Sequence, residues 1–271
     1  MIFEKFQNSD FDLVHTFECG QCFRWNKNED DSYIGIVGNS VIKIKQDNNI
    51  FVAETDDDEL INSYFDLKKD YSAIKAELAV RDDVLPKAIP AGYGIRLLTQ
   101  EPWEALVSFI ISANNNIPRI KKIIESLCKN FGNKIVHNDC VYYSFPDADT
   151  ISSLNVEQLD VIKSGFRAKY IIDAADKVSK GIVDLNAVYG MNTDEARECL
   201  KQIKGVGNKV ADCILLFAYQ KYDVFPKDVW IKKVLNDLYG VEEKDFDSFV
   251  KQHFGNLAGF AQQYLFYYMR G

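Results

Sequence analysis

The stretch Leu200–Leu235 reads LKQIKGVGNKVADCILLFAYQKYDVFPKDVWIKKVL. Gly205 and Gly207 stand in a G-V-G turn, where glycine permits positive φ and lets another backbone approach closely. The apolar positions that follow at helical spacing are Val210, Cys213, Ile214 and Phe217. Their i, i+3, i+4, i+7 spacing predicts a helix with one apolar face. The stretch therefore predicts a helix, a glycine hairpin, a second helix, an extended connection and a third helix.

Two charged residues stand at predicted helix starts. Lys209 lies in the first turn after the hairpin, where the positive end of the helix dipole and partial burial both disfavour an ammonium. A lysine whose pKa is lowered in this way is a nucleophilic amine that can form a Schiff base with an aldehyde-like carbon. Asp228 follows nineteen positions later (228 − 209), after Pro226 and Lys227. On its position alone, Asp228 is also a good helix N-cap.

At these residues the chain resembles the helix–hairpin–helix DNA glycosylases, whose signature is a hairpin followed by a Gly/Pro-rich turn and an aspartate. The hairpin lysine and the run KVADC are similar to the branch that excises 8-oxoguanine. The resemblance implies that Lys209 attacks the anomeric carbon of the damaged nucleotide and that Asp228 stabilises the developing sugar cation. It implies a bifunctional glycosylase and AP lyase in base excision repair, which flips the base out and cleaves the strand by β-elimination.

The resemblance also implies a lesion pocket. FECGQCFRW contains Gly20, whose carbonyl would accept a hydrogen bond from the imidazole-ring N–H that 8-oxoguanine has and guanine lacks. GFAQQYLF contains Gln262, which would pair with the Watson–Crick edge, and Phe266, which would stack on one face of the base. Cys213 would lie beneath the opposite face. From the residues alone, Gly20 also fits a tight turn between strands, and Phe266 also fits the core side of a helix.

Two further segments are implied to contact DNA. In SANNNIPR, Asn114 would enter the gap left by the flipped base and Arg119 would contact the estranged cytosine. In GFRAK, Phe166 would be a wedge and Arg167 a second cytosine-reading arginine. Arginine suits that role because two donors reach the acceptors of an unpaired base at once.

Three positions differ from the better-known members of that family. Phe166 replaces a tyrosine, Trp230 replaces a histidine that contacts phosphate, and Met269 replaces the acidic partner of that histidine. The last two differences are mutually consistent, because the histidine–carboxylate pair is lost as a unit. We expect 8-oxoguanine opposite cytosine to be preferred, but less strictly than in members that keep the tyrosine and the histidine.

The formal charge of −8, from 32 Lys and Arg against 40 Asp and Glu, by itself argues against a nucleic-acid partner. Two acidic runs, 29–31 and 56–59, are expected in loops and solvent-facing segments. Gly205 and Gly207 are expected to let the hairpin bind phosphate through backbone N–H groups and a helix dipole, which need little side-chain charge. Double-stranded DNA containing 8-oxoguanine is therefore the expected partner, with a strongly salt-sensitive affinity.

No metal cofactor is expected to be required. Cys19 and Cys22 have C-x-x-C spacing, but no second pair follows, and a zinc site needs four convergent ligands or three and a water. Family members with an iron–sulfur cluster carry four closely spaced cysteines after the aspartate, whereas no cysteine follows Cys213 here. We therefore expect neither zinc nor an iron–sulfur cluster. The resemblance implies at most a structural monovalent cation, held by the backbone carbonyls of Lys201, Ile203 and Val206.

The N-terminus, MIFEK, is charged at once, and no apolar run approaches membrane-spanning length. An intracellular protein without membrane contact is expected, located with the DNA in the cytoplasm and nucleoid if the source is bacterial. A monomer is the default expectation.

Alternating segments such as Ser32–Gly38 and Val41–Lys45 predict antiparallel strands up to about Glu54. Helical periodicity follows from Asp57, with first-turn prolines at 102 and 118. We expect an α+β fold, in which an N-terminal twisted antiparallel sheet packs on a mainly helical body. The expected divisions are 1–85 for the sheet domain with one flanking helix, 86–271 for the helical body, and 193–220 for the helix–hairpin–helix.

Two alternatives to 8-oxoguanine excision remain open. A glycosylase for alkylated or mismatched bases on the same scaffold usually lacks the hairpin lysine, so Lys209 weighs against it. A non-catalytic DNA-binding module would keep the hairpin only for phosphate contact, and the joint presence of Lys209 and Asp228 weighs against that.

Overall fold

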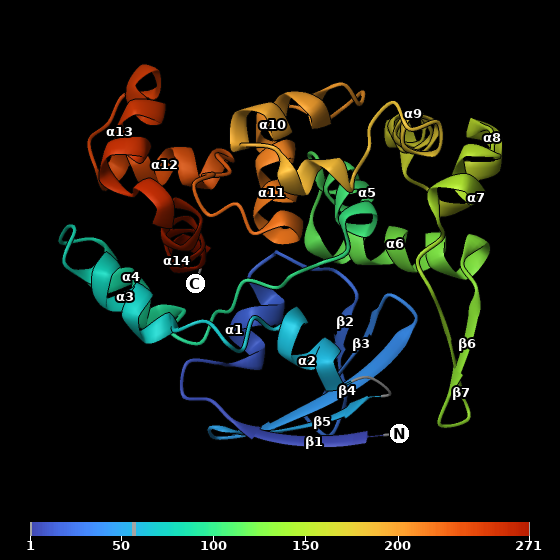
Figure 1. Cartoon of the computed structure of the whole chain (residues 1–271), viewed down its shortest axis with the longest axis horizontal. Coiled ribbons are helices and arrows are strands. Elements are labelled where there is room, and N and C mark those ends of the chain that lie inside the picture. The colour runs from blue at the N-terminus through green and yellow to red at the C-terminus, as the bar shows by residue number, and fades with distance from the viewer. Residues whose placement is uncertain (1, 56–57, 271) are drawn as a thin grey trace.

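The computed structural model describes residues 2–55 and 58–270 (Figure 1). Met1, Asp56, Asp57 and Gly271 lie outside the described residues, so the acidic run 56–59 is described only in part. The elements in chain order are β1 Ile2–Gln7, α1 Leu13–Glu18, β2 Trp25–Lys27, β3 Tyr33–Val37, β4 Ser40–Asp47, β5 Ile50–Thr55, α2 Asp58–Tyr64, α3 Tyr71–Ala79, α4 Leu85–Ala91, α5 Pro102–Ser112, α6 Ile117–Phe131, β6 Lys134–His137, β7 Cys140–Tyr143, α7 Ala148–Ser152, α8 Val156–Leu159, η1 Asp160–Ile162, η2 Gly165–Arg167, α9 Ala168–Ser179, η3 Ala187–Gly190, α10 Thr193–Lys201, α11 Asn208–Tyr219, α12 Val229–Asp237, η4 Glu243–Asp245, α13 Phe246–His253, η5 Gly255–Leu257 and α14 Ala258–Arg270.

The N-terminal part is an antiparallel five-stranded sheet in the order β1-β5-β4-β3-β2. The predicted pairing of the two alternating segments is confirmed, because β3 and β4 meet across a turn at Gly38-Asn39. Trp25 of β2 pairs with Gly35 of β3, and a Cβ added to Gly35 would lie 2.5 Å from the indole ring. The glycine therefore gives the buried Trp25 ring the space it occupies. The structure confirms the predicted α+β class.

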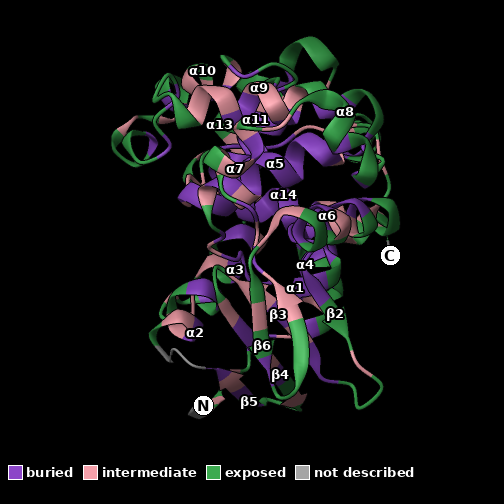
Figure 2. Cartoon of the chain, turned by 90° about the vertical axis from the view of Figure 1, so that its right-hand side faces the viewer, coloured by how far each residue is buried: buried purple, intermediate pink, exposed green. Residues whose placement is uncertain are grey.

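Two clusters of buried apolar side chains hold the chain together (Figure 2). The smaller lies between the sheet and α1 and α2, where Phe17 stacks on Trp25 with centroids 4.2 Å apart. The larger runs through α5, α11 and α14, and it includes Tyr71 and Leu78 of α3. Residues 13–79 thus carry three helices, whereas one flanking helix was expected. The division at residue 85 stays a proposal.

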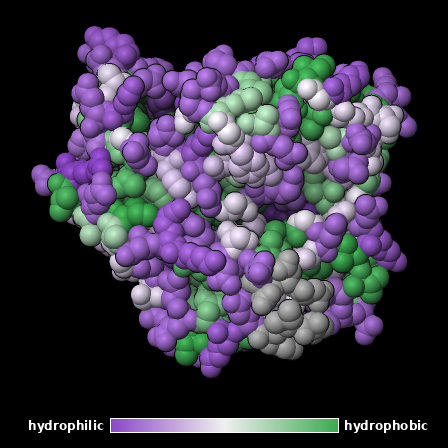
Figure 3. Space-filling model, viewed as in Figure 1, coloured by the Kyte–Doolittle hydropathy of each residue, from purple (hydrophilic) through white to green (hydrophobic). Residues whose placement is uncertain are grey.

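A short hairpin, β6–β7, interrupts the mainly helical part, and it was not predicted from the sequence. Its turn residues Asn138 and Asp139 have φ of 48° and 58°, the left-handed geometry of a two-residue hairpin turn. The consecutive residues Asn138 and Asp139 were therefore a local cue for this hairpin in the sequence. Val136 and Val141 on this hairpin are exposed. The face of the molecule in Figure 3 is mainly hydrophilic with separate apolar patches.

A buried ion pair joins the segment before α1 to α3. Lys75 Nζ lies 2.5 Å from Asp10 Oδ1 and donates to the carbonyl of Tyr93 at 3.0 Å, and Ser72 donates to Asp10 Oδ2 at 2.6 Å. Burial by itself raises the pKa of Asp10, but the hydrogen bonds from Lys75 and Ser72 outweigh it and lower the pKa. The ionised pair therefore stabilises the fold above the ordinary pKa of aspartate, and that contribution is lost as the pH falls through the pKa of folded Asp10.

We expect Lys75→Met to lower the free energy of unfolding by about 3 kcal/mol at pH 7, because it leaves a buried carboxylate unpaired. The difference from the parent should shrink as the pH falls below the ordinary pKa of aspartate and through the lowered pKa of folded Asp10, because the carboxylate then becomes protonated. Urea unfolding of both proteins at several pH values measures this. Lys68→Met, at an exposed position of the preceding segment, is the control and should stay close to the parent. A pH-independent difference would show that the loss comes from packing and not from charge.

Candidate active site and DNA-binding surface

The hairpin lies between α10 and α11, as predicted. Gly205 has φ +85°, and a Cβ there would lie 2.6 Å from the ring of Tyr170, so both conformation and space require glycine. Gly207 does not use the positive φ that glycine permits, because it is the extended N-cap of α11. A Cβ on Gly207 would meet no atom within 4 Å. Because Gly207 has no side chain that could cap the helix, the first N–H groups of α11 stay open to an anion.

Helix α11 is buried on all sides from Val210 to Tyr219, which corrects the expectation of one apolar face. Lys209 is its second residue, is partly exposed, and holds its ammonium 5.7 Å from the centroid of the Phe109 ring of α5. Burial raises the pKa of the Cys213 thiol, and the Lys209 ammonium beside it acts in the opposite direction. In the described part of the chain, no carboxylate forms an ion pair with Lys209. An unpaired amine therefore lies at the exposed end of a buried helix.

Asp228 caps α12, which confirms the N-cap reading. Its Oδ1 accepts hydrogen bonds from the amides of Trp230 at 3.0 Å and Ile231 at 2.9 Å. Within the described residues, no hydrogen bond engages Oδ2. The negative charge of Asp228 adds to the raised pKa of the buried Cys213 thiol, whereas the Lys209 ammonium opposes that rise. The cap thus fixes one oxygen and leaves the other free to act on a bound molecule.

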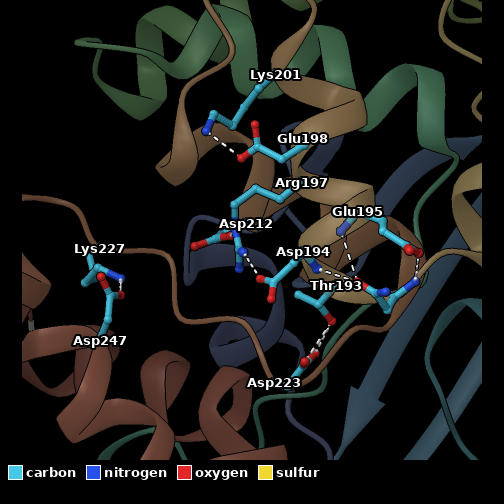
Figure 4. A network of polar contacts seen from close by, with 11 residues as sticks. Thr193, Asp194, Glu195, Arg197, Glu198, Lys201, Asp212, Asp223, Lys227 and Asp247 are labelled. Carbon is cyan, nitrogen blue, oxygen red and sulfur yellow. Dashed lines mark hydrogen bonds and ion pairs between the residues drawn. The ribbon is translucent and has the colours of Figure 1, made fainter.

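Ion pairs connect α10 to α11, and connect the segment before α12 to α13 (Figure 4). Arg197 of α10 lies 2.7 Å from Asp212 of α11 and 2.6 Å from Asp194. Burial raises the pKa of Asp212, although the Arg197 guanidinium opposes that shift. Lys227 pairs with Asp247 of α13 at 2.7 Å. Sequence reasoning missed this network, because nothing in the local pattern reveals which charges meet across the hairpin.

Gly20 lies against Phe266, although the two are far apart in sequence. Gly20 has φ +82°, and a Cβ there would lie 3.6 Å from the Phe266 ring, 3.8 Å from Ile117 and 3.5 Å from the Arg270 guanidinium. The loop is held by the buried side chain of Gln21, which is hydrogen-bonded to three backbone groups, including the carbonyl of Thr16 at 2.9 Å. The donor Nε2 binds the carbonyl of Arg96 at 2.7 Å, and the acceptor Oε1 binds the amide of Leu98 at 2.9 Å.

Gln262 lies one turn before Phe266 on α14 and is 4% exposed. Its Nε2 donates to the carbonyl of Pro226 at 3.3 Å, two residues before Asp228, and its Oε1 accepts from Gln263 at 2.7 Å. Helix α14 therefore links the Gly20 loop to the connection that leads into α12. Gln263 and Arg270 are additional neighbours of this region that sequence reasoning did not identify.

The loop between α5 and α6 forms a second part of the surface. Asn114 is exposed with φ +50°. Arg119 is exposed, whereas Arg167 is only 2% exposed and donates to the carbonyls of Ala113 and Asn114. Burial lowers the pKa of Arg167, and the nearby charge of Arg119 adds to the effect. Phe166 is 53% exposed, and its ring centroid lies 4.4 Å from the Arg167 guanidinium. The two arginines are therefore in different environments.

Of the three carbonyls proposed for a cation, that of Ile203 accepts a hydrogen bond from the amide of Val206 at 3.1 Å, and the Lys201 side chain pairs with Glu198. A carbonyl has a second lone pair, so the cation site stays a prediction. No cluster of three His, Cys, Asp or Glu that could hold a metal occurs in the described residues. Across residues 2–55 and 58–270, no helix is both long and apolar enough to cross a bilayer.

The acidic turn at 29–31 is exposed, as expected, and much of its charge is locally paired. Asp30 lies 3.1 Å from Lys43, and Asp31 lies 2.8 Å from Lys27. Trp230 and Met269, which differ from the better-known members, lie on α12 and α14. Trp230 is 44% exposed, so an aromatic surface stands where the resemblance implied a phosphate-binding histidine.

Two family models together match most of the chain. The model described as "8-oxoguanine DNA glycosylase, N-terminal domain" matches residues 5–106, and the "HhH-GPD superfamily base excision DNA repair protein" model matches residues 107–258. The N-glycosylase/DNA lyase of Saccharomyces cerevisiae is 35% identical over 263 residues, which is 86% of this chain and 69% of the relative.

Solved structures support the same family assignment. The 8-oxoguanine glycosylase/lyase of Clostridium acetobutylicum, in complex with double-stranded DNA containing cytosine opposite 8-oxoguanine, is 41% identical with a TM-score of 0.93 over 100% of this chain and 98% of that one. MBOgg1, in complex with a low-affinity DNA ligand, is 43% identical with a TM-score of 0.94, over 100% of this chain and 99% of that one. The chain belongs to the HhH-GPD superfamily of base excision DNA repair proteins, and within it to the group with the 8-oxoguanine DNA glycosylase N-terminal domain.

Proposed function

We propose that this chain is a bifunctional DNA glycosylase and AP lyase that removes 8-oxoguanine from duplex DNA in base excision repair. The observation that carries the proposal is the placement of Lys209 and Asp228. Lys209 lies in the first turn of α11, and Asp228 caps α12 through Oδ1 alone, which leaves Oδ2 without a hydrogen bond among the described residues. Relatives with this fold are named N-glycosylase/DNA lyase and 8-oxoguanine glycosylase/lyase.

The chemistry follows from the two groups. Lys209 Nζ, after losing a proton, forms a bond to C1′ of the flipped nucleotide, while the bond from C1′ to the base breaks and the base leaves with its electron pair. Positive charge develops on the sugar during this step, and the free Oδ2 of Asp228 stabilises it. Ring opening then gives a Schiff base. Loss of a C2′ proton drives β-elimination, in which the C3′–O bond breaks and the strand is cut.

Recognition of the oxidised base rests on one hydrogen bond and on stacking. The carbonyl of Gly20 accepts the N7–H that 8-oxoguanine carries, and guanine would leave that carbonyl unpaired at a cost of about 1–3 kcal/mol. Phe266 lies against Gly20, so its ring stacks on one face of the base, with Cys213 on the other. Gln262 supplies a donor and an acceptor for the Watson–Crick edge.

Double-stranded DNA is gripped mainly through backbone groups. The open N–H groups at the start of α11 bind phosphate, and Asn114 and Phe166 enter the space that the flipped base leaves. The exposed Arg119 reads the opposite base. The reaction needs no cofactor, since the amine and the carboxylate come from the chain, and a monovalent cation at the hairpin has a structural role only. We propose that the protein acts as a monomer, inside the cell and in the compartment that contains the DNA.

Reduction with borohydride on DNA containing 8-oxoguanine tests the proposal directly, because it makes the Schiff base permanent. The parent protein should become covalently attached to the damaged strand and not to undamaged DNA. Attachment only to DNA with an alkylated or mismatched base would identify a different glycosylase. Tight binding without any attachment would identify a non-catalytic module.

We expect Lys209→Gln to reduce base excision by at least about 1,000-fold and to abolish trapping, because the nucleophile is removed. DNA binding should persist, since the hairpin backbone donors remain. Single-turnover excision and a binding titration measure the two effects. Lys233→Gln removes an exposed cation of α12 and should excise normally. Normal turnover by Lys209→Gln would refute the Schiff-base assignment.

Asp228→Asn should slow excision by about 100-fold or more while costing little thermal stability. Asparagine still caps a helix, but it cannot stabilise the sugar cation with a negative charge. Excision rates and melting temperatures of parent and variant test this. Full activity combined with a sharp drop in melting temperature would mean that Asp228 is a cap alone.

Phe266→Ala should weaken binding to lesion DNA by about 1–3 kcal/mol, because a stacking platform is lost, with little effect on undamaged duplex. Gln262→Ala should act in the same direction. Tyr268→Ala, at an exposed aromatic on the same helix, is the matched control. Binding titrations with both DNAs measure the effect. Equal losses on lesion and undamaged DNA would assign Phe266 and Gln262 to the core.

A further inference from the structure

Two adjacent buried glutamines on α14 form a chain of hydrogen bonds. Gln262 and Gln263 are each 4% exposed, within a stretch of the helix whose residues are all buried. Gln263 Nε2 donates to Gln262 Oε1 at 2.7 Å, and Gln262 Nε2 donates to the carbonyl of Pro226 at 3.3 Å. The carboxamide of Gln262 is therefore held at both of its ends, once by a side chain and once by the backbone.

The carbonyl of Pro226 sets the direction of this chain. A carbonyl oxygen only accepts, so Gln262 must turn Nε2 toward it and Oε1 toward Gln263. Gln263 must then present its own Nε2, because two amide oxygens would repel each other. A half-turn of the terminal torsion would exchange the oxygen and the nitrogen of Gln262 and would break both bonds. Gln263 and Pro226 thus select one of the two carboxamide orientations, and the bond from Gln263 is the shorter.

Gln263 does not serve the stability of the core. Its Oε1 is buried, and no donor among the residues that the structure describes binds it. A buried acceptor without a partner destabilises the folded state, and an apolar side chain of similar length would avoid that loss. The hydrogen bond to Gln262 is therefore the feature of this side chain that needs a functional explanation.

Stacking and the Gly20 carbonyl do not distinguish one 8-oxopurine from another. 8-Oxoguanine and 8-oxoadenine both carry the N7–H that this carbonyl accepts, and both present flat faces to Phe266 and Cys213. They differ at the Watson–Crick edge, where 8-oxoguanine places the acceptor O6 beside the donor N1–H, and 8-oxoadenine places the donor N6–H beside the acceptor N1. A carboxamide that turns freely can pair with either order, because it carries both a donor and an acceptor. A carboxamide that is held in one orientation pairs with only one order.

We propose that Gln263 is a positioning residue that determines specificity: by fixing the Gln262 carboxamide, it lets the site accept the edge of oxidised guanine and reject that of oxidised adenine. The inference rests on the proposed function, because it concerns the same pocket. Gln262 keeps a second lone pair on Oε1 and a second proton on Nε2 for the base. The wrong edge would leave these buried groups unpaired, which is the condition under which a binding site discriminates strongly.

Single-turnover excision of 8-oxoguanine and of 8-oxoadenine, each opposite cytosine, tests the proposal. Gln263→Met keeps the length of the side chain but removes the donor, so the ratio of the two rates should shift toward 8-oxoadenine by about 10-fold or more. Comparing this ratio with that of the parent cancels the different leaving abilities of the two bases. Gln252→Met, at an exposed glutamine of α13, is the matched control and should keep the ratio of the parent. An unchanged ratio in Gln263→Met, or an equal loss with both bases, would overturn the proposal.

Thermal stability separates the hydrogen bond from packing. Gln263→Met should melt at or above the temperature of the parent, because it removes the unpartnered oxygen. Gln263→Ala should lose specificity to the same extent but melt at a lower temperature, because it leaves a cavity. A shifted ratio in Gln263→Ala alone would show that the packing of α14, and not the donor, sets the specificity, and would overturn the proposal.

A double-mutant cycle tests whether Gln263 acts through Gln262. In a Gln262→Ala background, Gln263→Met should change the ratio of the two excision rates by about twofold or less, since no carboxamide remains to be fixed. A change as large as the one seen in the parent background would show that Gln263 acts on the base independently of Gln262, which contradicts the positioning role.

Exchange of the Gln262 side-chain amide protons, followed by NMR without DNA, tests the restraint apart from any activity. Gln263→Met should speed this exchange by about 10-fold or more, because the carboxamide becomes free to turn. Unchanged exchange would refute the restraint. A parent that excises neither base would refute the proposed function, and the exchange would still decide whether Gln263 holds Gln262. A parent that excises both bases at the same rate is a glycosylase without the specificity that we assign to Gln263.

Discussion

Burial of α11 on all sides is the constraint on which the rest of the site depends. A helix that is enclosed in this way cannot shift without disturbing the whole body, so its first turn is held in a fixed place. Asp212 can be part of such a helix only because Arg197 pairs with it at 2.7 Å. Lys209 is at the one end that is partly open. The site thus combines a partly exposed amine with a rigid support.

The same helix explains how an acidic protein can hold DNA. The open N–H groups after Gly207 and the positive end of the helix dipole attract phosphate without a cluster of basic side chains. Some of the negative charge lies far from the hairpin in sequence and is neutralised locally, as at Asp30 with Lys43 and Asp31 with Lys27. The formal charge of −8 therefore says little about the surface that meets DNA.

Coupling between surface elements runs through α9. This helix contacts the hairpin through Tyr170 and Asp173, and it directly follows Arg167, which binds carbonyls of the loop between α5 and α6. Four hydrogen bonds from the buried Arg167 side chain tie the start of α9 to that loop.

The sequence by itself determined the features that depend on neighbouring residues. The G-V-G turn, the N-cap at Asp228, the alternating strands and the first-turn prolines were all readable, because backbone conformation and capping are decided within a few positions. The two-residue turn at Asn138-Asp139 was equally local, and its cue was overlooked.

Tertiary structure alone decided which of these pieces meet. Gly20 and Phe266 lie 246 positions apart (266 − 20) and approach because Gln21 pins one loop while α14 packs in the larger core. The different environments of Arg119, which is exposed, and Arg167, which is buried, likewise depend on tertiary packing, which residue type does not encode. The physical reason is that packing and hydrogen-bond satisfaction depend on atoms brought together from distant parts of the chain, so no local pattern contains them.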